Sequence, residues 1–441
     1  MARRQASQPQ SPGARPAAAR AARGAGGRAG VNARGGAKAT RGGTHGPPGE
    51  GKRGADRFAA RRATLARTLP EGVDTLLVSN PMDVAYLTGF LGGDSVLLLP
   101  RAGGRGGSGG GRRGNAVGAI VSDFRYEEEL AALGYGSGGH RSGGGLDVVI
   151  RRVPMPEFLR TYLLDPAFGR VGVQGEHMTA GERDGLVAAL GAGRIATTSG
   201  LVAPLRVVKD EDEVATIRRA ARIQEQALLA VLAHLRPGLT ELDVAAHLEA
   251  EMKARGSTQP GFTTIVAARA NGSLPHYRAG KTKLAANQPV LIDWGAVVDG
   301  YHSDMTRTFT LGKWPAKVRE IYQIVLEAHE AAAAALRPGA VARDIDAIAR
   351  KIITDAGYGE HFGHGLGHGL GFNGHELPRL TYMAPKDAPE ELRPGMVLTI
   401  EHGIYLPGVG GVRIEDDYVI TERGAKNLCT LPRSLEWSTL A

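Results

Sequence analysis

Residues 290 to 311 read VLIDWGAVVDGYHSDMTRTFTL, and this stretch decides the fold because it predicts two apolar strands joined by a turn. The strands run from Val290 to Gly295 and from Ser303 to Leu311. Between them, Val298-Asp299-Gly300 is a hairpin turn signal. The sequence therefore predicts a β-hairpin at this point of the chain.

Each strand of this hairpin carries one acidic residue. Asp293 lies directly opposite Asp304 if the turn is Val298-Asp299, and the two are diagonal neighbours if the turn is Asp299-Gly300. Either register places both carboxylates on one face, because side chains alternate with a period of two. Like charges about 5 Å apart destabilise a sheet. A cation or a shared proton is therefore required between them.

A second hairpin repeats this geometry. The strands Val397 to Tyr405 and Gly411 to Ile420 flank a Gly-rich turn, and folding them about Gly408 sets Glu401 opposite Glu415. The apolar neighbours of all four acids argue against a solvated polar face. Four converging carboxylates disfavour ionising together, so a pair of divalent metals is their simplest neutraliser.

Imidazole is supplied by a His/Gly tract, FGHGLGHGLG at residues 362 to 371, with His375 seven residues after His368. Alternating glycines allow a backbone or a ligand to approach closely. Such a tract alone fits a flexible or adventitious metal-binding segment equally well. Beside two carboxylate hairpins, it predicts a histidine ligand.

The hairpins belong to a duplicated domain that starts at residue 208. Amphipathic periodicity predicts four long helices: Glu211–Leu235, Glu241–Arg255, Ala316–Leu336 and Asp344–Ala356. In both pairs the first helix ends in Leu-Arg-Pro-Gly and the second helix ends at a glycine. Each pair is followed by β-rich sequence. Helices segregated from hairpins predict an α+β fold with pseudo-two-fold symmetry.

Residues 58–207 alternate short apolar runs with helical stretches, which predicts a smaller α/β domain. Two Gly-rich segments, 103–114 and 136–145, interrupt it without the pattern of a phosphate loop. We interpret them as surface insertions. The arginines of the first insertion resemble an RGG segment, which keeps RNA binding as a minor alternative: Arg105, Arg112 and Arg113.

The net charge of +9 comes from the first 57 residues. They hold 12 Lys/Arg and 2 Asp/Glu, which leaves 42 basic and 43 acidic residues in 58–441. This Ala/Gly/Arg-rich segment is predicted to be a disordered basic tail. It has no apolar core of a secretory signal, so a cytoplasmic location is expected. No apolar run reaches about 18 residues, the length that a membrane-spanning helix needs.

The lone Cys429 excludes an intramolecular disulfide framework and a cysteine metal cluster.

Several motifs together resemble the pita-bread metallopeptidases, which include methionine aminopeptidase, aminopeptidase P and prolidase. The resemblance covers residues 208 to 441 and is carried by Asp293-Trp294-Gly295, Ser303-Asp304-Met305-Thr306-Arg307-Thr308, His364-x3-His368-x6-His375-Glu376, Glu401 and Val412-Arg413-Ile414-Glu415. Upstream, three motifs resemble the creatinase-like N-terminal domain of the proline-specific members: Tyr86-Leu87-Thr88-Gly89-Phe90, Ser122-Asp123-Phe124-Arg125-Tyr126 and Lys209-Asp210-Glu211-Asp212-Glu213. The resemblance points to the Xaa-Pro branch.

This resemblance implies a dinuclear metal site. Asp293 would be bidentate to one metal, Asp304 and Glu415 would bridge both, and His368 and Glu401 would complete the other. Oxygen ligands with one imidazole suit manganese first, with cobalt or zinc as substitutes. The metals would acidify a water, and Glu401 would carry its proton.

The resemblance also implies substrate contacts and partners. His276 would bind the substrate near the scissile bond, and His375 would stabilise the oxyanion. His364 and Arg413 would line the side that accepts proline. The expected substrate is a short peptide with proline in second position. A homodimer is expected, no membrane association, and contact with nucleic acid only through the basic tail.

The sequence departs from the family pattern at two places. His402 stands where proline usually follows the metal-binding glutamate, and it either perturbs the loop at Glu401 or adds an imidazole near the metals. Asn373-Gly374 precede His375 where acidic or apolar residues are commoner.

Several functions stay open beside Xaa-Pro hydrolysis. They are an aminopeptidase of broader specificity on the same fold, a catalytically inactive homologue that binds RNA or ribosomes through the tail, and metal-free creatine-type hydrolysis. The five filled ligand positions disfavour the last. Prolidase and aminopeptidase P are not distinguished.

The basic tail is predicted to be dispensable for catalysis, because it cannot pack and every candidate site residue lies beyond residue 275. A chain that starts near Asp56 should keep the kcat and KM of the full chain. Steady-state kinetics of the two proteins tests this, and a large fall in kcat after truncation would show that the tail has been misinterpreted.

Overall fold

The structure is a computed structural model that describes residues 52–103, 118–135, 145–385, 387 and 390–440. Most of the predicted tail and of both Gly-rich segments lies outside the described residues. Helix α1 (Lys52–Arg67) begins inside the segment predicted to be disordered. A truncation that keeps α1 whole therefore starts at or before Lys52.

The N-terminal α/β domain is built on a mixed six-stranded sheet. Its strand order is β4-β3-β2-β1-β5-β6. The strands β1/β2 and β2/β3 pair antiparallel, and the other neighbours are parallel. The strands are β1 (Thr75–Val78), β2 (Val96–Pro100), β3 (Ala119–Asp123), β4 (Asp147–Arg151), β5 (Val171–Gln174) and β6 (Ile195–Thr198).

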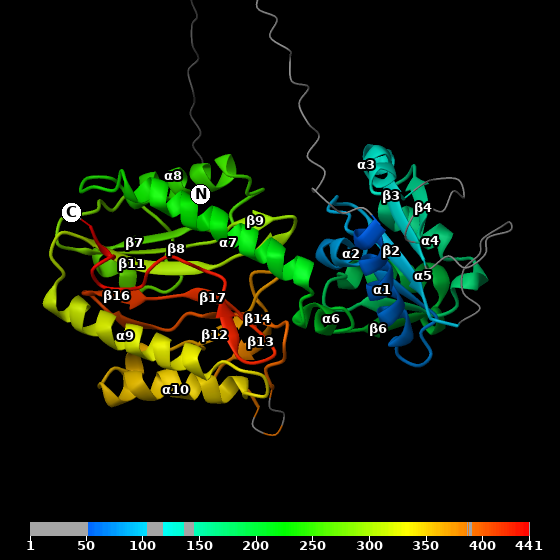
Figure 1. The fold of residues 1–441 in the computed structure, drawn as a ribbon. Coiled ribbons are helices and arrows are strands. Elements are labelled where there is room, and N and C mark those ends of the chain that lie inside the picture. Colours follow the sequence, from blue (N-terminus) through cyan, green and yellow to red (C-terminus); the bar gives the residue numbers. More distant parts are fainter. Residues whose placement is uncertain (1–51, 104–117, 136–144, 386, 388–389, 441) are drawn as a thin grey trace, which may run out of the picture. The chain divides into compact units, whose positions relative to one another are not determined.

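Helices cover both faces of this sheet (Figure 1). In β1, Leu76 and Val78 pack in the cluster that includes α1 and α2, whereas Leu77 packs in the cluster of α4 and α5. Because helices cover both faces, every residue of β1 is buried. The helices are α2 (Pro81–Thr88), η1 (Phe124–Tyr126), α3 (Glu127–Ala132), α4 (Met155–Tyr162), η2 (Pro166–Phe168), α5 (Ala180–Leu190), η3 (Ala192–Arg194) and α6 (Ala203–Val207).

The first half of the catalytic domain packs two helices on a four-stranded sheet of order β19-β11-β8-β7 (Figure 1). The helices α7 and α8 begin at capping boxes formed by Asp210 with Glu213 and by Thr240 with Asp243. The elements are α7 (Glu211–Leu232), α8 (Glu241–Ala254), β7 (Ile265–Ala268), η4 (Arg269–Ser273), β8 (Pro289–Trp294), β9 (Val297–Val298), β10 (Tyr301–His302), β11 (Met305–Leu311) and β19 (Thr439–Leu440).

The second half repeats this design. Its helices α9 and α10 pack on strands of a five-stranded sheet of order β13-β12-β14-β17-β18, and a separate β15–β16 pair extends the hairpin. The elements are α9 (Ala316–Ala335), α10 (Ala342–Asp355), η5 (Gly359–His361), β12 (Gly367–Gly369), β13 (Glu376–Leu380), β14 (Val397–Ile400), β15 (Gly403–Leu406), β16 (Gly410–Arg413), β17 (Asp416–Ile420) and β18 (Ala425–Asn427). The predicted α+β fold with a duplicated catalytic domain is confirmed.

The first hairpin adopts the second of the two predicted registers. Val298 pairs with Tyr301, so Asp299 and Gly300 form the turn with φ of 49° and 82°. Positive φ at both positions is typical of a type I′ turn. Asp293 pairs with Thr306, which makes Asp304 its diagonal neighbour.

The second hairpin has the predicted register but not the predicted continuous strands. Ile400 pairs with Asp416 and Gly403 with Arg413, so the same register sets Glu401 opposite Glu415. Residues 401–402 and 414–415 leave the strand conformation and divide the hairpin into two sheets. Both acidic residues therefore lie at a break between strands.

None of the helices in the described ranges combines the length and the apolar character that crossing a lipid bilayer requires.

Candidate metal centre

Five side chains predicted from the sequence come from five different places in the catalytic domain. His368 Nε2 lies 3.3 Å from Glu401 Oε1 and 4.0 Å from Asp304 Oδ2. One ligand-type atom each of Asp304, His368 and Glu415 lies within 4.8 Å of the other two. The positions are Asp293 on β8, Asp304 between β10 and β11, His368 on β12, Glu401 after β14 and Glu415 before β17.

Two carboxylates of this cluster are each held by the protein through one oxygen. Asp293 Oδ2 accepts from Arg413 Nη2 at 2.5 Å, and Glu415 Oε2 accepts from Thr306 Oγ1 at 2.7 Å. The other oxygen of each, together with Oδ1 of Asp304, is buried without a hydrogen-bond partner among the described residues. An unpaired buried acceptor costs about 1–3 kcal/mol, so a proton or a cation is needed.

The raised pKa values of three carboxyl groups also indicate that the cluster needs a proton or a cation. Burial and the charge of Glu415 raise the pKa of Asp304 well above its usual range. Burial and the charge of Glu401 do the same to the pKa of Glu415, and burial raises the pKa of Glu401 to about 8. Carboxylate oxygens with one imidazole form a donor set that fits a hard or borderline divalent cation.

His368 is held in the tautomer that binds metals. Its Nδ1 lies 3.0 Å from the carbonyl oxygen of Gly369. Because a carbonyl only accepts, Nδ1 carries the proton, and Nε2 presents a lone pair toward Glu401 and Asp304. Burial and the neighbouring His375 lower the pKa of His368 to about 3, so the imidazole is neutral.

Arg413 is buried within the carboxylate cluster. Besides Asp293 it donates from Nη1 to Tyr405 Oη at 2.9 Å and from Nε to Thr306 Oγ1 at 3.0 Å. The structure thus places Arg413 against Asp293, and its predicted contact with proline remains a prediction. Tyr405 in turn lies 2.9 Å from Nε2 of His364. Burial and the charge of Arg413 lower the pKa of His364 to about 4.

Sequence reasoning missed the roles of Thr306 and Tyr405. The Thr306 hydroxyl accepts from Arg413 and donates to Glu415, so it orients both groups. Strand alternation already places Thr306 on the face of Asp304, which is a signal that could have found it. The predicted register of the second hairpin likewise makes Tyr405 a diagonal neighbour of Arg413, whereas its contact with His364 joins segments 41 residues apart and has no local signal.

The two other predicted histidines are exposed beside the cluster. The ring of His375 lies 4.1 Å from the ring of His368, measured between centroids. Burial raises the pKa of Asp293. The charge of Arg413 lowers it most strongly, and the charge of the nearby His276 lowers it as well. Both imidazoles therefore lie near the carboxylates with a solvent-accessible side.

The loop before His375 is anchored by Glu376. This buried carboxylate accepts from Lys209 Nζ at 3.1 Å, from Arg206 Nη2 at 3.1 Å and from the backbone N–H of Asn373 at 3.0 Å. The unusual Asn373 therefore keeps the loop tied to the Glu376 carboxylate through its backbone. Lys209 contributes its charge from just before α7.

His402 turns away from the carboxylates, which resolves the two alternatives left by the sequence. Its side chain is fully buried, and Nε2 lies 2.8 Å from the carbonyl oxygen of Val325 in α9. Nε2 therefore donates, and the imidazole fastens the loop after Glu401 to the helix. The backbone N–H of Glu401 is fixed from the other side by the carbonyl of Leu366 at 2.8 Å.

Two family profiles match the chain. Metallopeptidase family M24 matches residues 215–422, and the Creatinase/Prolidase N-terminal domain matches residues 61–208. The M24 match lies inside the predicted domain 208–441, and the N-terminal match covers the predicted domain 58–207 from residue 61 and runs one residue past its end. The first contains all five clustered residues.

Relatives and solved structures resemble most of the chain. An uncharacterized peptidase of Bacillus subtilis is 34% identical over 366 residues, which cover 82% of this chain and 96% of the relative. A Xaa-Pro dipeptidase of Pyrococcus furiosus is 43% identical over 53% of this chain and 66% of its own. The structure of a Xaa-Pro dipeptidase from Bacillus anthracis has a TM-score of 0.76 at 32% identity, covering 87% of this chain and all of that chain. An X-Pro aminopeptidase from Thermotoga maritima has a TM-score of 0.71 at 30% identity, covering 84% and 97%.

We expect His402→Gln to leave the metal content of the protein unchanged, because the imidazole faces α9 and a glutamine amide can still donate to Val325. His368→Gln, the matched change within the cluster, should lower the metal content. Elemental analysis of both variants after reconstitution with Mn²⁺ and dialysis tests this. Parallel losses of metal in the two variants would contradict the assignment of His402.

Proposed function

The chain belongs to metallopeptidase family M24, and on that premise we propose that it hydrolyses the peptide bond between an N-terminal residue and proline. The proposal is supported by the creatinase-type N-terminal domain and by relatives and structures named as Xaa-Pro peptidases. The observation that carries it is the convergence of Asp304, Glu401 and Glu415 on His368. The charge of Asp293 acts on all three acids, and three carboxylate oxygens of the cluster are buried and unpaired among the described residues.

We propose Asp293, Asp304, His368, Glu401 and Glu415 as the ligands of two divalent ions. The unpaired oxygens of three carboxylates and the free Nε2 of His368 support this assignment. Manganese is the ion that we propose first, because the donor set is almost entirely oxygen. The homodimer and the cytoplasmic location stay predictions.

When bound, the metals supply an activated water at neutral pH. Glu401 would hold the proton released from this water, at the edge of the cluster. His375 would donate to the oxygen that becomes negative in the transition state, and His276 would orient the substrate carbonyl. Arg413 and Thr306 keep Asp293 and Glu415 in place, so their oxygens need no rearrangement during the reaction.

Neither dipeptidase nor aminopeptidase activity is favoured, because structures named for each resemble the chain to a similar degree. The alternative of RNA binding through the basic tail concerns residues outside the described ranges. Metal-free creatine-type hydrolysis is disfavoured by a complete set of ligand-type residues. A broader aminopeptidase is distinguished by the choice of substrates.

Replacement of a proposed bridging ligand should release metal. Asp304→Asn or Glu415→Gln is expected to bind less than one ion per chain where the unchanged protein binds two, and to lose at least a hundredfold in kcat. Elemental analysis and isothermal titration of metal into the chelated protein measure this.

Glu241→Gln is the matched control, because Glu241 is also buried but its carboxylate already accepts from Ala268, Asn271 and Gly280. It should bind two ions. Full metal binding by Asp304→Asn and Glu415→Gln would contradict the ligand assignment.

Substrate preference is tested with an Xaa-Pro dipeptide, the matching Xaa-Pro-Yaa tripeptide and an Xaa-Ala control under Mn²⁺. Both proline substrates should be cleaved far faster than the control. His375→Ala should lower kcat more than it raises KM, because an oxyanion contact strengthens only in the transition state.

The ratio of the two proline substrates then separates a dipeptidase from an aminopeptidase. Equal or faster cleavage of the alanine control would overturn the proline assignment and leave the metal site standing.

A further inference from the structure

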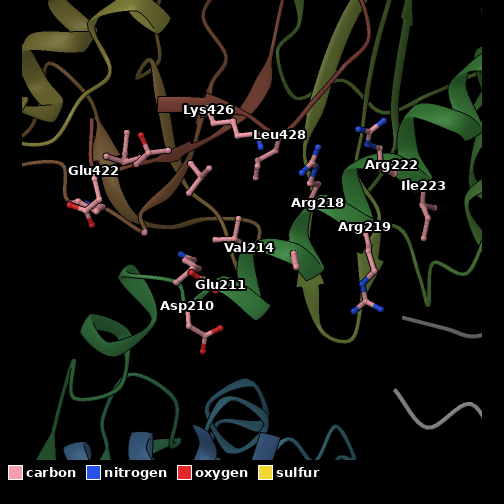
Figure 2. Close-up of a pocket in the computed structure, with 17 residues that line it drawn as sticks. Asp210, Glu211, Val214, Arg218, Arg219, Arg222, Ile223, Glu422, Lys426 and Leu428 are labelled. Carbon is pink, nitrogen blue, oxygen red and sulfur yellow. The ribbon is translucent and has the colours of Figure 1, made fainter. Parts of the chain in front are cut away.

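A groove of about 1060 Å³ lies between one face of α7 and the β17–β18 end of the five-stranded sheet. None of the residues proposed for metal or substrate binding lines it. Figure 2 shows that α7 supplies one wall and that Lys426 and Leu428 stand on the other. The groove is thus separate from the carboxylate cluster, and the proposed peptidase activity gives it no role.

One end of the groove presents three unpaired cations. Arg218 and Arg222 are one turn apart on α7 and therefore project from the same face of the helix. Lys426 faces them from β18. All three are exposed, and none of their side chains makes a hydrogen bond or an ion pair with another described residue.

Arg219 shows the contrast. It also borders the groove, but it donates to Asp299 at 2.6 Å and points away from Arg218 and Arg222 (Figure 2). Its charge is therefore matched within the protein, whereas those of Arg218 and Arg222 are directed into the groove with no counterion from the described residues.

The remaining lining is apolar in the middle and acidic at the opposite end. Val214 of α7, which lies between Glu211 and Arg218 along the helix, and Val419 of β17 are among the aliphatic residues of the floor. Figure 2 shows Glu211 and Glu422 at the end away from the arginines. The groove therefore presents positive charge, aliphatic surface and negative charge in sequence.

This pattern excludes several occupants. The lining holds no aromatic side chain on which a nucleobase could stack, and its acidic end repels a phosphate backbone. The volume is far larger than a single phosphate needs. The chain's own basic tail has the wrong charge for the arginine end.

We propose that this groove binds a short acidic peptide segment of a partner protein. Aspartate or glutamate side chains of the segment pair with Arg218, Arg222 and Lys426, and the apolar residues that follow lie on the aliphatic floor. Charge at the rim determines which partner is accepted and how fast it associates, and burial of the apolar residues supplies affinity.

The test uses the full-length protein and a fluorescein-labelled, N-acetylated peptide of three glutamates followed by three leucines. Two matched probes replace the glutamates by lysines or the leucines by serines. Fluorescence anisotropy should show that the Glu/Leu peptide binds at least tenfold tighter than either matched probe. Binding should weaken as salt is added, because the charged contacts are exposed.

Charge reversal identifies the groove. The double variant Arg218→Glu/Arg222→Glu should weaken the Glu/Leu peptide at least tenfold and gain affinity for the Lys/Leu peptide. Lys253→Glu, an exposed lysine of α8 outside the groove, should change neither. Circular dichroism and metal content verify that the variants stay folded.

Four outcomes would overturn the proposal. They are no measurable binding of the Glu/Leu peptide, equal binding of the Glu/Leu and Lys/Leu peptides, a single-stranded RNA that competes and depends on Arg218 and Arg222, and a change of molecular mass in solution on charge reversal. The last would assign the groove to contact between copies of this chain. Peptidase activity enters none of these measurements, so failure of the proposed function leaves the test intact.

Discussion

Mutual repulsion among buried carboxylates is the constraint on which the catalytic domain depends. Asp304, Glu415 and Glu401 cannot all be ionised in a buried cluster unless positive charge is added. Among the described residues, Arg413 is the guanidinium buried beside them, and it is already directed to Asp293. The fold can bring these acids together because their hairpins pack against two helix pairs. The free energy gained by packing the two halves thus offsets the cost of burying several carboxylates together without a cation.

The neighbouring Asp416 shows what the cluster lacks. It is as deeply buried as Glu415, but Arg307 donates to it at 2.6 Å and Arg433 also donates to it. Although burial opposes ionisation, Arg307 holds the pKa of Asp416 below its usual range. Of these two adjacent acids, Asp416 at the start of β17 is therefore neutralised by the protein, and Glu415 just before β17 is left for a ligand.

The helices and the register of the second hairpin could be predicted because their signals are local. The predicted helix that begins at Glu211 ends three residues beyond the observed Leu232, and Gly408 sets the second register correctly. The first register stayed open, since both Asp299-containing turns fit the strands. The contact of Arg413 with Asp293, the bond of His402 to α9 and the strand breaks could not be predicted. Each depends on packing between segments more than 70 residues apart or on the two halves together.

The two halves are joined through the cluster itself, because the backbone N–H of Glu415 donates to the carbonyl of Thr306 at 3.1 Å. Asp293 is the first of the five clustered residues to be synthesised and Glu415 is the last. A ribosome must therefore add 122 further residues before a site begun at Asp293 is complete. An early metal encounter would meet only one acidic hairpin. Loading of the complete centre must follow folding of the second half, so the supply of metal acts on a nearly finished protein.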